Sequence, residues 1–410
     1  MRTKLTCPTL VLGLLLAGCN GDTTPAPPTS EDPGEQNLGY LDELADLGYV
    51  DFSDSEPEGA EAEASGVLLH ESDAAWSGVN LYTSLPDSAA YLMDMEGRVL
   101  HAWHDEKGID TRWTRVELLP DGDVLCVSPK ENHLVRKAWD GTERWRIDLD
   151  AHHDVRVDPR GRILVLTRTL RRIEEVHPRR YTVDNGIAFI SADGELLSEY
   201  SLYDILSKVP ELPIEAPKSI ERMPPDTNVD PIHANTVEPM RFPELAAENP
   251  IFAPDNLLVT LRVTSAIVMI DPDEERVVWW WGTDELEGPH DATVMENGHI
   301  LVLDNGWVER GYSRVVEVDP VTREIVWEYT APTPEHFFTA GRGTVQPLPN
   351  GNVLVGNSNS GEAFEVTREG RVVWRFLNPS VDDSGKRAVL RIRRFEEEVI
   401  GAILRRVEGR

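Results

Sequence analysis

The chain has 410 residues and a formal net charge of -32 at pH 7, with 72 acidic against 40 basic side chains. A chain of this length can bury a large core, and its excess of carboxylates would repel nucleic acid, because no basic stripe offsets it. Any anionic substrate would therefore need local positive groups that act against the field of the whole protein.

Residues 1–18 have the pattern of a secretory signal peptide. Arg2 and Lys4 precede an apolar run that is too short to span a bilayer. The run ends in the letters LAGC at residues 16–19, which resemble a bacterial lipobox and imply cleavage before Cys19 and a lipid on its thiol. An ordinary signal peptide with an incidental cysteine is the alternative. We therefore expect an exported protein, lipid-anchored to a bacterial membrane and facing the periplasm or the cell exterior.

Residues 19–66 are predicted to form a lipidated, disordered acidic linker. From residue 20 onward this segment holds 13 acidic side chains and no Lys or Arg, and Pro, Thr, Ser and Gly are frequent. Such a composition buries too little apolar area to offset the entropy of ordering. Within the linker, residues 38–50 place leucines at helical spacing, and they could dock on the body or remain a nascent helix.

Residues 67–410 repeat a pair of strands, which predicts an all-β domain. Turns such as Asn297-Gly298 are each followed by an apolar strand, HILVL in this case. A second turn then leads to a strand with an aromatic residue near its end. Six such aromatics mark the period: Trp103, Trp145, Tyr200, Trp280, Trp327 and Trp374. This pattern predicts a six-bladed β-propeller in which the aromatics pack blade against blade.

Two insertions interrupt the period. Extra residues near 201–232 are expected to form a short helix and a loop over one face of the propeller. A second insertion, RFPELAAENPIF, falls inside the fourth blade. The six aromatic markers span both insertions, so the predicted number of blades stays at six.

Three histidines open the first strands of the predicted third, fourth and fifth blades: His153, His233 and His290. Because a radial repeat places matching positions around one axis, we expect these imidazoles to converge at one mouth of the axial channel. The alternative is structural, since a His-Asp pair before a propeller strand can simply cap its blade by hydrogen bonds.

Positive and amide side chains are expected at the same mouth. The second strand of each blade returns antiparallel, so Arg168, Arg262 and the turn at 304–306 should end where the histidines begin. Arg262 should lie beside His233, and Asn235 follows two residues along that strand. Such a group would form a site for an anion, although Arg168 could instead pair with blade carboxylates.

Four segments resemble one known family, the bacterial arylsulfotransferases (aryl-sulfate sulfotransferases). The segments are HANTVEP at 233–239, the run at 255–282, PHDATVMENGHILVLDNG at 289–306 and the run at 343–366. The resemblance covers roughly residues 75–395. It implies a six-bladed propeller that moves a sulfuryl group from a phenolic sulfate donor to a phenol acceptor through a sulfated histidine, without nucleotide sulfate, metal or other cofactor.

Carried over residue by residue, the resemblance implies that His290 becomes sulfated and that His153 is the remaining channel histidine. His233, Asn235 and Arg262 match sulfate-binding positions. Pro289 departs from the family, which usually has Gln there, and Gly343 opens the sixth blade. The sequence thus assigns catalytic roles to His290, His233, Arg262 and His153, and substrate binding to Asn235 and Arg168.

The residue types fit this chemistry on physical grounds, independently of the family resemblance. Sulfuryl transfer spreads charge over peripheral oxygens, as phosphoryl transfer does, so positioning and electrostatics supply most of the catalysis. A neutral imidazole is a competent nucleophile, and Arg262 offers forked donors to the oxygens. The departing phenolate could take a proton from His153 or His233. Asp291 or a backbone carbonyl could fix the tautomer of a neighbouring histidine.

Two functions from other classes are the alternatives. A ring of three histidines could hold a divalent metal in a hydrolase or lyase, but a nearby Arg262 guanidinium would repel the cation. A lipid-anchored propeller that only binds is the second alternative, because the fold does not determine the function. Acceptor-dependent turnover of an aryl sulfate would separate the sulfotransferase from the binding module.

Overall fold

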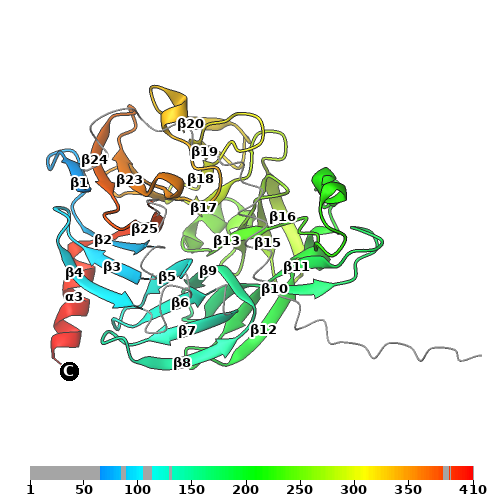
Figure 1. Cartoon of the computed structure of the whole chain (residues 1–410), viewed down its shortest axis with the longest axis horizontal. Helices are drawn as coiled ribbons and strands as arrows, with labels where there is room; N and C mark the ends of the chain where they lie inside the picture. Colours follow the sequence, from blue (N-terminus) through cyan, green and yellow to red (C-terminus); the bar gives the residue numbers. More distant parts are fainter. Residues whose placement is uncertain are drawn as a thin grey trace, which may run out of the picture. The chain divides into compact units, whose positions relative to one another are not determined.

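The computed structural model describes residues 65–84, 89–104, 113–128, 132–381, 387 and 389–409. The strands form six antiparallel sheets, one of five strands and five of four. These sheets are arranged radially, with one strand of each near a common centre and the last strand of each toward the periphery (Figure 1). The six-bladed β-propeller predicted from the aromatic period is therefore confirmed.

The residues that the structure describes all belong to one compact unit. The expected signal peptide, Cys19 and the 38–50 segment all lie outside the described residues. Of the expected linker, only Ser65 and Gly66 are described, and Gly66 opens the first strand. The predictions for the N-terminal region therefore remain predictions.

Each blade is an antiparallel meander whose strands follow one another from the axis outward. Blade 1 consists, from the innermost strand, of β25 (Val389–Phe395), β2 (Val79–Ser84), β3 (Ala89–Met93) and β4 (Val99–His104). Blade 2 consists of β5 (Arg115–Leu118), β6 (Val124–Ser128), β7 (His133–Lys137) and β8 (Glu143–Asp148). Blade 3 consists of β9 (Ala151–Val157), β10 (Ile163–Arg171), β11 (Thr182–Ile190) and β12 (Leu196–Ser201).

The other three blades follow the same plan. Blade 4 consists of β13 (Ala234–Pro239), β14 (Leu257–Leu261), β15 (Ala266–Asp271) and β16 (Arg276–Trp281). Blade 5 consists of β17 (His290–Val294), β18 (Ile300–Asp304), β19 (Arg314–Val318) and β20 (Ile325–Tyr329). Blade 6 consists of β21 (Thr344–Pro347), β22 (Val353–Asn357), β23 (Glu362–Val366), β24 (Val372–Leu377) and β1 (Gly66–His70).

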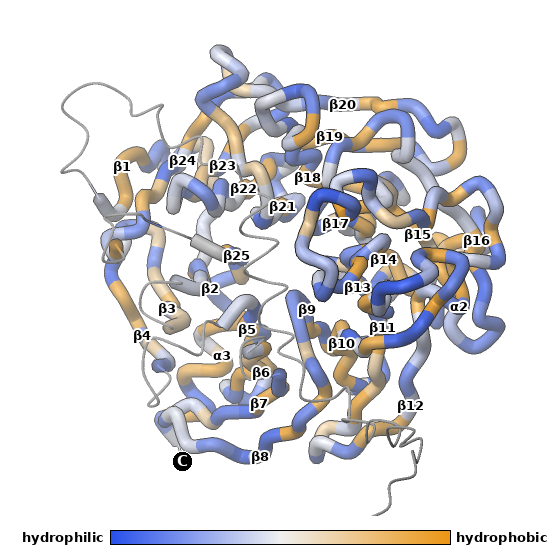
Figure 2. The backbone as a smooth tube through the Cα atoms, turned by 45° about the vertical axis from the view of Figure 1, so that its right-hand side comes forward, coloured by the Kyte–Doolittle hydropathy of each residue, from blue (hydrophilic) through white to orange (hydrophobic). Residues whose placement is uncertain are grey.

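Six hydrophobic clusters of the described residues each lie between two neighbouring blades, and a seventh lies in the connections around residues 173–176 and 220–229. The cluster between blades 6 and 1, for example, joins Trp374 and Phe376 of β24 to Tyr82 of β2 and Met93 of β3. Hydrophobic residues lie on strands of every blade (Figure 2). Middle strands are buried on both faces, because each blade packs against two neighbours. All six marker aromatics lie in or against such clusters, so their predicted packing role is confirmed.

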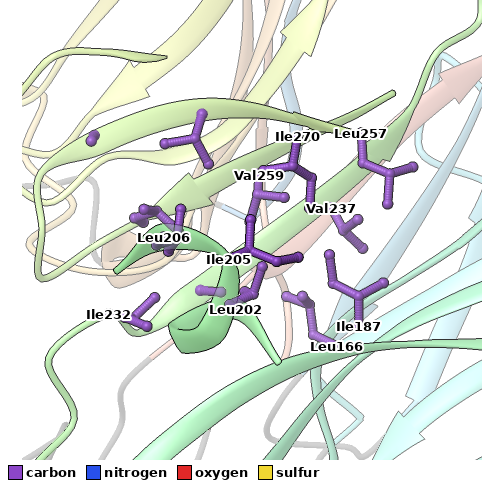
Figure 3. Close-up of a cluster of buried hydrophobic side chains, with 14 of the residues drawn as sticks. Leu166, Ile187, Leu202, Ile205, Leu206, Ile232, Val237, Leu257, Val259 and Ile270 are labelled. Carbon is purple, nitrogen blue, oxygen red and sulfur yellow. The ribbon is translucent and has the colours of Figure 1, made fainter. Parts of the chain in front are cut away.

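Both predicted insertions are present. Residues between β12 and β13 form α2 (Leu202–Leu206), a loop and the short 3-10 helix η2 (Lys218–Arg222), which confirms the short helix and loop. Leu202, Ile205 and Leu206 of α2 pack against strands of blades 3 and 4 (Figure 3). The insertion in blade 4 forms η3 (Pro243–Ala247) and η4 (Pro250–Phe252), and η5 (Pro334–His336) and η6 (Ser358–Ser360) lie in later connections.

The ends of the described chain close the ring, which the sequence analysis did not predict. The C-terminal strand β25 pairs with β2 and so supplies the innermost strand of blade 1, while β1 pairs with β24 on the outside of blade 6. The helix α3 (Glu397–Glu408) then packs its Ile400 and Ile403 against blades 1 and 2. Backbone hydrogen bonds of these strands thus join the two ends of the described chain to blades 1 and 6.

Arg394 of β25 is bonded to several elements at this closure. Its Nε donates to Asn80 Oδ1 at 2.8 Å, and its Nη1 donates to the Trp76 carbonyl oxygen at 2.8 Å. The guanidinium also pairs with the buried Glu365 of β23 and lies 4.8 Å from the ring centre of Trp374. One fully buried cation therefore joins blades 1 and 6.

We predict that Arg394→Ala lowers the free energy of unfolding by about 3–5 kcal/mol, because Glu365 would stay buried without its cation. The matched control is Arg405→Ala on the exposed side of α3, which should change stability by no more than about 0.5 kcal/mol. Denaturant unfolding followed by tryptophan fluorescence measures both. A loss in Arg394→Ala no larger than in the control would contradict this role.

Candidate active site

The inner strands of blades 3, 4 and 5 each contain a bulge near their start, and the predicted residues lie there. The strand pairing next to the hairpin is Val157 with Ile163, Pro239 with Leu257 and Val294 with Ile300. Counting back four residues from Val157, Pro239 and Val294 gives the matching position of each blade. This position holds His153 in blade 3, Asn235 in blade 4 and His290 in blade 5. Asn235 therefore occupies the position matching His153 and His290, and His233 stands two residues earlier than the sequence repeat suggested.

The bulges turn the backbone into conformations that ordinary residues rarely adopt. His153 has φ 55°, His233 has φ 50° and Asp291 has φ 51°. Left-handed backbone at non-glycine residues costs free energy and persists only where surrounding bonds determine it. A bulge also re-aims the side chains next to it, which explains how residues at unequal positions of the repeat can meet.

His153 and His233 are in direct contact. Their Nε2 atoms lie 3.0 Å apart and their ring centres 4.9 Å apart. The Nδ1 atom of His233 lies 2.8 Å from Asp230 Oδ2, and the backbone N–H of His233 donates to Asp230 Oδ1 at 2.8 Å. Asp230 was not among the residues singled out from the sequence, because it lies in the irregular insertion before β13.

His290 has both ring nitrogens engaged. Its Nδ1 lies 2.9 Å from Asn305 Oδ1 and 3.1 Å from the Gly288 carbonyl oxygen, while its Nε2 accepts from the Arg342 backbone N–H at 3.0 Å. Asn305 donates its Nδ2 hydrogens to the carbonyl oxygens of Thr339 and Arg342, so its oxygen faces the imidazole. The proton of His290 therefore resides on Nδ1 and the lone pair on Nε2.

Arg262 lies between His233 and the aromatic ring of Trp307. Its backbone N–H donates to the His233 carbonyl oxygen at 3.1 Å, and its guanidinium lies 4.7 Å from the ring centre of Trp307. Gly288 makes room for this ring, because a Cβ there would come within 2.1 Å of the indole nitrogen. The indole thus supports the flat face of the guanidinium.

The electrostatic environment keeps two of the histidines neutral. Burial lowers the pKa of His290 well below its usual 6.5, and the positive charge of Arg262 lowers it further. Burial also lowers the pKa of His153 well below 6.5, and its histidine neighbours add to this effect. Burial alone would raise the pKa of Asp230, yet attraction and hydrogen bonds from His233 bring that pKa below its usual range. Asp230 is therefore a carboxylate at neutral pH.

The two predicted substrate-binding residues lie in different surroundings. Asn235 is buried and donates from Nδ2 to the Pro289 carbonyl oxygen at 2.8 Å, which ties blade 4 to the residue before His290. Arg168 lies toward blade 2, where its Nη2 is 3.4 Å from Asn132 Oδ1. The amide of Asn235 thus holds the site together within the protein.

A buried network of charged side chains lies one to three residues further along the inner strands. Arg156 of β9 pairs with Asp154 at 3.3 Å and with Asp291 of β17 at 3.2 Å. Arg391 of β25 pairs with Asp291 at 3.2 Å and donates to the carbonyl oxygens of His153 and Asn235 at 3.2 and 3.0 Å. The network therefore fixes the backbone that carries the site, and the sequence analysis missed it.

The aspartates of the two His-Asp pairs serve this structural role. Asp154 Oδ2 accepts from the Val237 N–H and Asp291 Oδ2 accepts from the Val345 N–H, each at 3.0 Å, so each carboxylate caps the next blade. The capping alternative thus holds for the aspartates. The tautomer of His290 is fixed by Asn305 and a backbone carbonyl, and Asp291 is occupied with the arginines.

Among the residues that the structure describes, no group of three or more His, Cys, Asp or Glu side chains is arranged to hold a metal ion. Within the same residues, no helix is long and apolar enough to cross a membrane.

A β-propeller with a neutral, tautomer-fixed histidine beside an arginine is suited to nucleophilic transfer of an anionic group. The family model described as Arylsulfotransferase (ASST) matches residues 115–379, well over half of the chain. The chain therefore belongs to the arylsulfotransferase family, as the sequence resemblance predicted. Membership supports arylsulfotransferase activity in general and places the protein among the transferases.

No curated protein matches the sequence significantly. Among solved structures, a protein of unknown function from Bacteroides caccae is 17% identical and has a TM-score of 0.51, with 78% of this chain and 100% of that chain covered. A catalytically inactive virginiamycin B lyase from Staphylococcus aureus with quinupristin is 11% identical, with 76% and 88% covered and a TM-score of 0.45. These likenesses concern the fold alone.

The lowered pKa values predict an acid-sensitive stability. Above about pH 6.5 the imidazoles are neutral in both states; as the pH falls below 6.5, the unfolded chain binds protons that the folded protein does not, so stability is lost. Each such histidine contributes a slope of up to about 1.4 kcal/mol per pH unit. Urea unfolding between pH 7.5 and 5 should show a shallower slope in His290→Gln. An unchanged slope would mean that His290 is not held neutral.

Proposed function

We propose that the protein moves a sulfuryl group from a phenolic sulfate to a phenol through a sulfated His290, without a nucleotide sulfate. The observation that carries the proposal is the fixed tautomer of His290, whose Nε2 lone pair is unprotonated while Nδ1–H is held by Asn305 Oδ1 at 2.9 Å. A neutral imidazole at this depth is a ready nucleophile. Membership of the arylsulfotransferase family supports the same reaction class.

In the first half-reaction, Nε2 of His290 attacks sulfur, the N–S bond forms, and the bond from sulfur to the phenolic oxygen breaks. Arg262 offers fixed donors to the sulfuryl oxygens. Its positive charge attracts the negative sulfuryl group locally, although the protein as a whole is acidic. The Arg342 N–H, which occupies Nε2 at rest, must leave the lone pair before attack. In the second half-reaction a phenol oxygen attacks sulfur and His290 is regenerated, which gives ping-pong kinetics.

The position of Arg262 also bears on the metal-dependent alternative. Its guanidinium lies close enough to His290 to lower the imidazole pKa, and a fixed positive charge at that place would repel a cation. The same charge attracts a sulfate ester. The arrangement therefore favours an anion over a metal ion at this site.

We also propose that the protein is exported and lipid-anchored. The proposal rests on the signal-like residues 1–18 and on Cys19 in its lipobox-like setting. The site would then face the periplasm or the cell exterior, where it would meet small phenolic sulfates and phenols. The strongly acidic composition supports the absence of nucleic acid from its partners.

The first experiment traps the intermediate. Incubation with 4-nitrophenyl sulfate in the absence of acceptor should release one equivalent of nitrophenol and add a sulfuryl group to the His290 peptide in mass spectra. His290→Gln should abolish both, because the lone pair that attacks sulfur in this proposal belongs to His290 Nε2. The matched control is His299→Gln at the opposite end of the same hairpin, where Nδ1 bonds Glu317. Equal activity of His290→Gln and the control would refute the assignment.

Arg262→Ala should reduce kcat/KM for the donor by roughly 10²–10³-fold, the typical effect of removing one preorganised donor. Arg276→Ala, on the outermost strand of the same blade and paired with Asp271, is the control and should remain close to the unmodified protein. Steady-state rates with 4-nitrophenyl sulfate and phenol measure the difference. A fall of less than about threefold in Arg262→Ala would show that the guanidinium does not hold the sulfuryl group.

A further inference from the structure

The Nδ1–H groups of two histidines in the site are hydrogen-bonded to chemically different acceptors. His290 Nδ1 faces the neutral amide oxygen of Asn305 at 2.9 Å, whereas His233 Nδ1 faces the carboxylate of Asp230 at 2.8 Å. A carboxylate stabilises the imidazolium form of its partner, and an amide does so much less. The Nδ1 partner is thus a neutral amide at one histidine and a negative charge at the other.

Asp230 is held in a defined place although it lies in an insertion. Asn185 of β11 donates to Asp230 Oδ1 at 3.1 Å and accepts from the Ala234 N–H at 2.9 Å. Val229, just before Asp230, is fully buried, and its backbone exchanges hydrogen bonds with Tyr181 and Val183. The carboxylate is therefore positioned by β11 as firmly as a residue on a regular strand.

A third residue extends the chain of groups. The Nε2 atoms of His153 and His233 lie 3.0 Å apart, which requires one proton between them. Because His233 already commits its Nδ1 proton to Asp230, that shared proton belongs to His153 when both rings are neutral. Within the described part of the chain, no hydrogen bond involves His153 Nδ1. His153, His233 and Asp230 thus form a hydrogen-bonded series, in which Nδ1 of His153 is the nitrogen left to accept a proton.

We propose that His153, His233 and Asp230 form a proton relay for the acceptor half-reaction, in which Asp230 is the positioning residue. The inference rests on the proposed function and adds to it the acceptor class. Because the relay removes the acceptor's proton, it makes weakly acidic phenols, which are little ionised at neutral pH, usable acceptors.

Bonds and protons balance in this half-reaction. The acceptor oxygen attacks the sulfur of sulfated His290, the S–O bond forms, and the S–N bond breaks with its electron pair returning to Nε2. The acceptor's proton moves to Nδ1 of His153 while the Nε2 proton of His153 passes to Nε2 of His233. The resulting imidazolium is stabilised by Asp230. The same proton returns to the departing phenolate in the next donor half-reaction.

Asp230→Asn tests the relay, since the amide keeps the shape and removes the charge. The nitrophenol burst without acceptor should persist, because nitrophenolate leaves readily without a proton. Turnover with weakly acidic phenols should fall by about 10²-fold, the usual contribution of a general base. Phenols made acidic by electron-withdrawing groups should lose much less. Asp226→Asn, an exposed carboxylate of the same insertion, is the matched control.

The outcomes separate the two proposals. No burst in the unmodified protein would refute the sulfated histidine itself. If the unmodified protein shows the burst, three results in Asp230→Asn would overturn the relay. They are an equal loss of turnover with all acceptors, no loss of turnover, and loss of the burst. A second measurement needs no variant: the acceptor half-reaction should slow in deuterium oxide with weakly acidic phenols, and the burst should not. Equal rates in both solvents for those phenols would also overturn the relay.

Discussion

The buried pairing of Arg156 and Arg391 with Asp154 and Asp291 is the interaction on which the site depends. Charges buried this deeply are tolerated only when they are paired, and each of these arginines contacts both aspartates, from different blades. Arg391 also holds the carbonyl oxygen of His153, and the aspartates cap the neighbouring inner strands. Blades that could otherwise shift against one another are thus fixed at the axis, and the left-handed turns that aim the histidines stay in place.

The histidine rings held by this network are chemically identical but have different roles in the proposed reaction. Burial and Arg262 keep His290 neutral, and an amide fixes its proton on Nδ1. His233 instead has its Nδ1 against the carboxylate of Asp230, 2.8 Å away. Environment alone therefore distinguishes a nucleophile from a base, as paired titratable groups in active sites generally do. A local guanidinium is needed in addition, because the rest of the chain is acidic and disfavours a sulfate ester.

The sequence predicted the six blades well, because hairpin glycines and buried aromatics such as Trp374 are local signals with a fixed period. It also predicted that Arg262 adjoins His233. It did not predict that Asn235, rather than His233, stands at the position matching the other histidines, because the insertion after β13 replaces the short turn that marks the register in the other blades. Asp230 escaped notice because nothing in an irregular insertion indicates which backbone will anchor it. The closing strand β25 was missed because its partner lies near the other end of the chain.

Transfer through His290 requires an unprotonated Nε2 at neutral pH, and nitrogen-15 NMR of histidine-labelled protein reports the protonation of each ring nitrogen. The His290 ring should be neutral, with its proton on Nδ1 and an unprotonated Nε2, and it should be unchanged in the Asp230→Asn protein. A proton on Nε2, or an imidazolium at neutral pH, would rule out His290 as the nucleophile, because the ring would then lack the lone pair that the transfer requires.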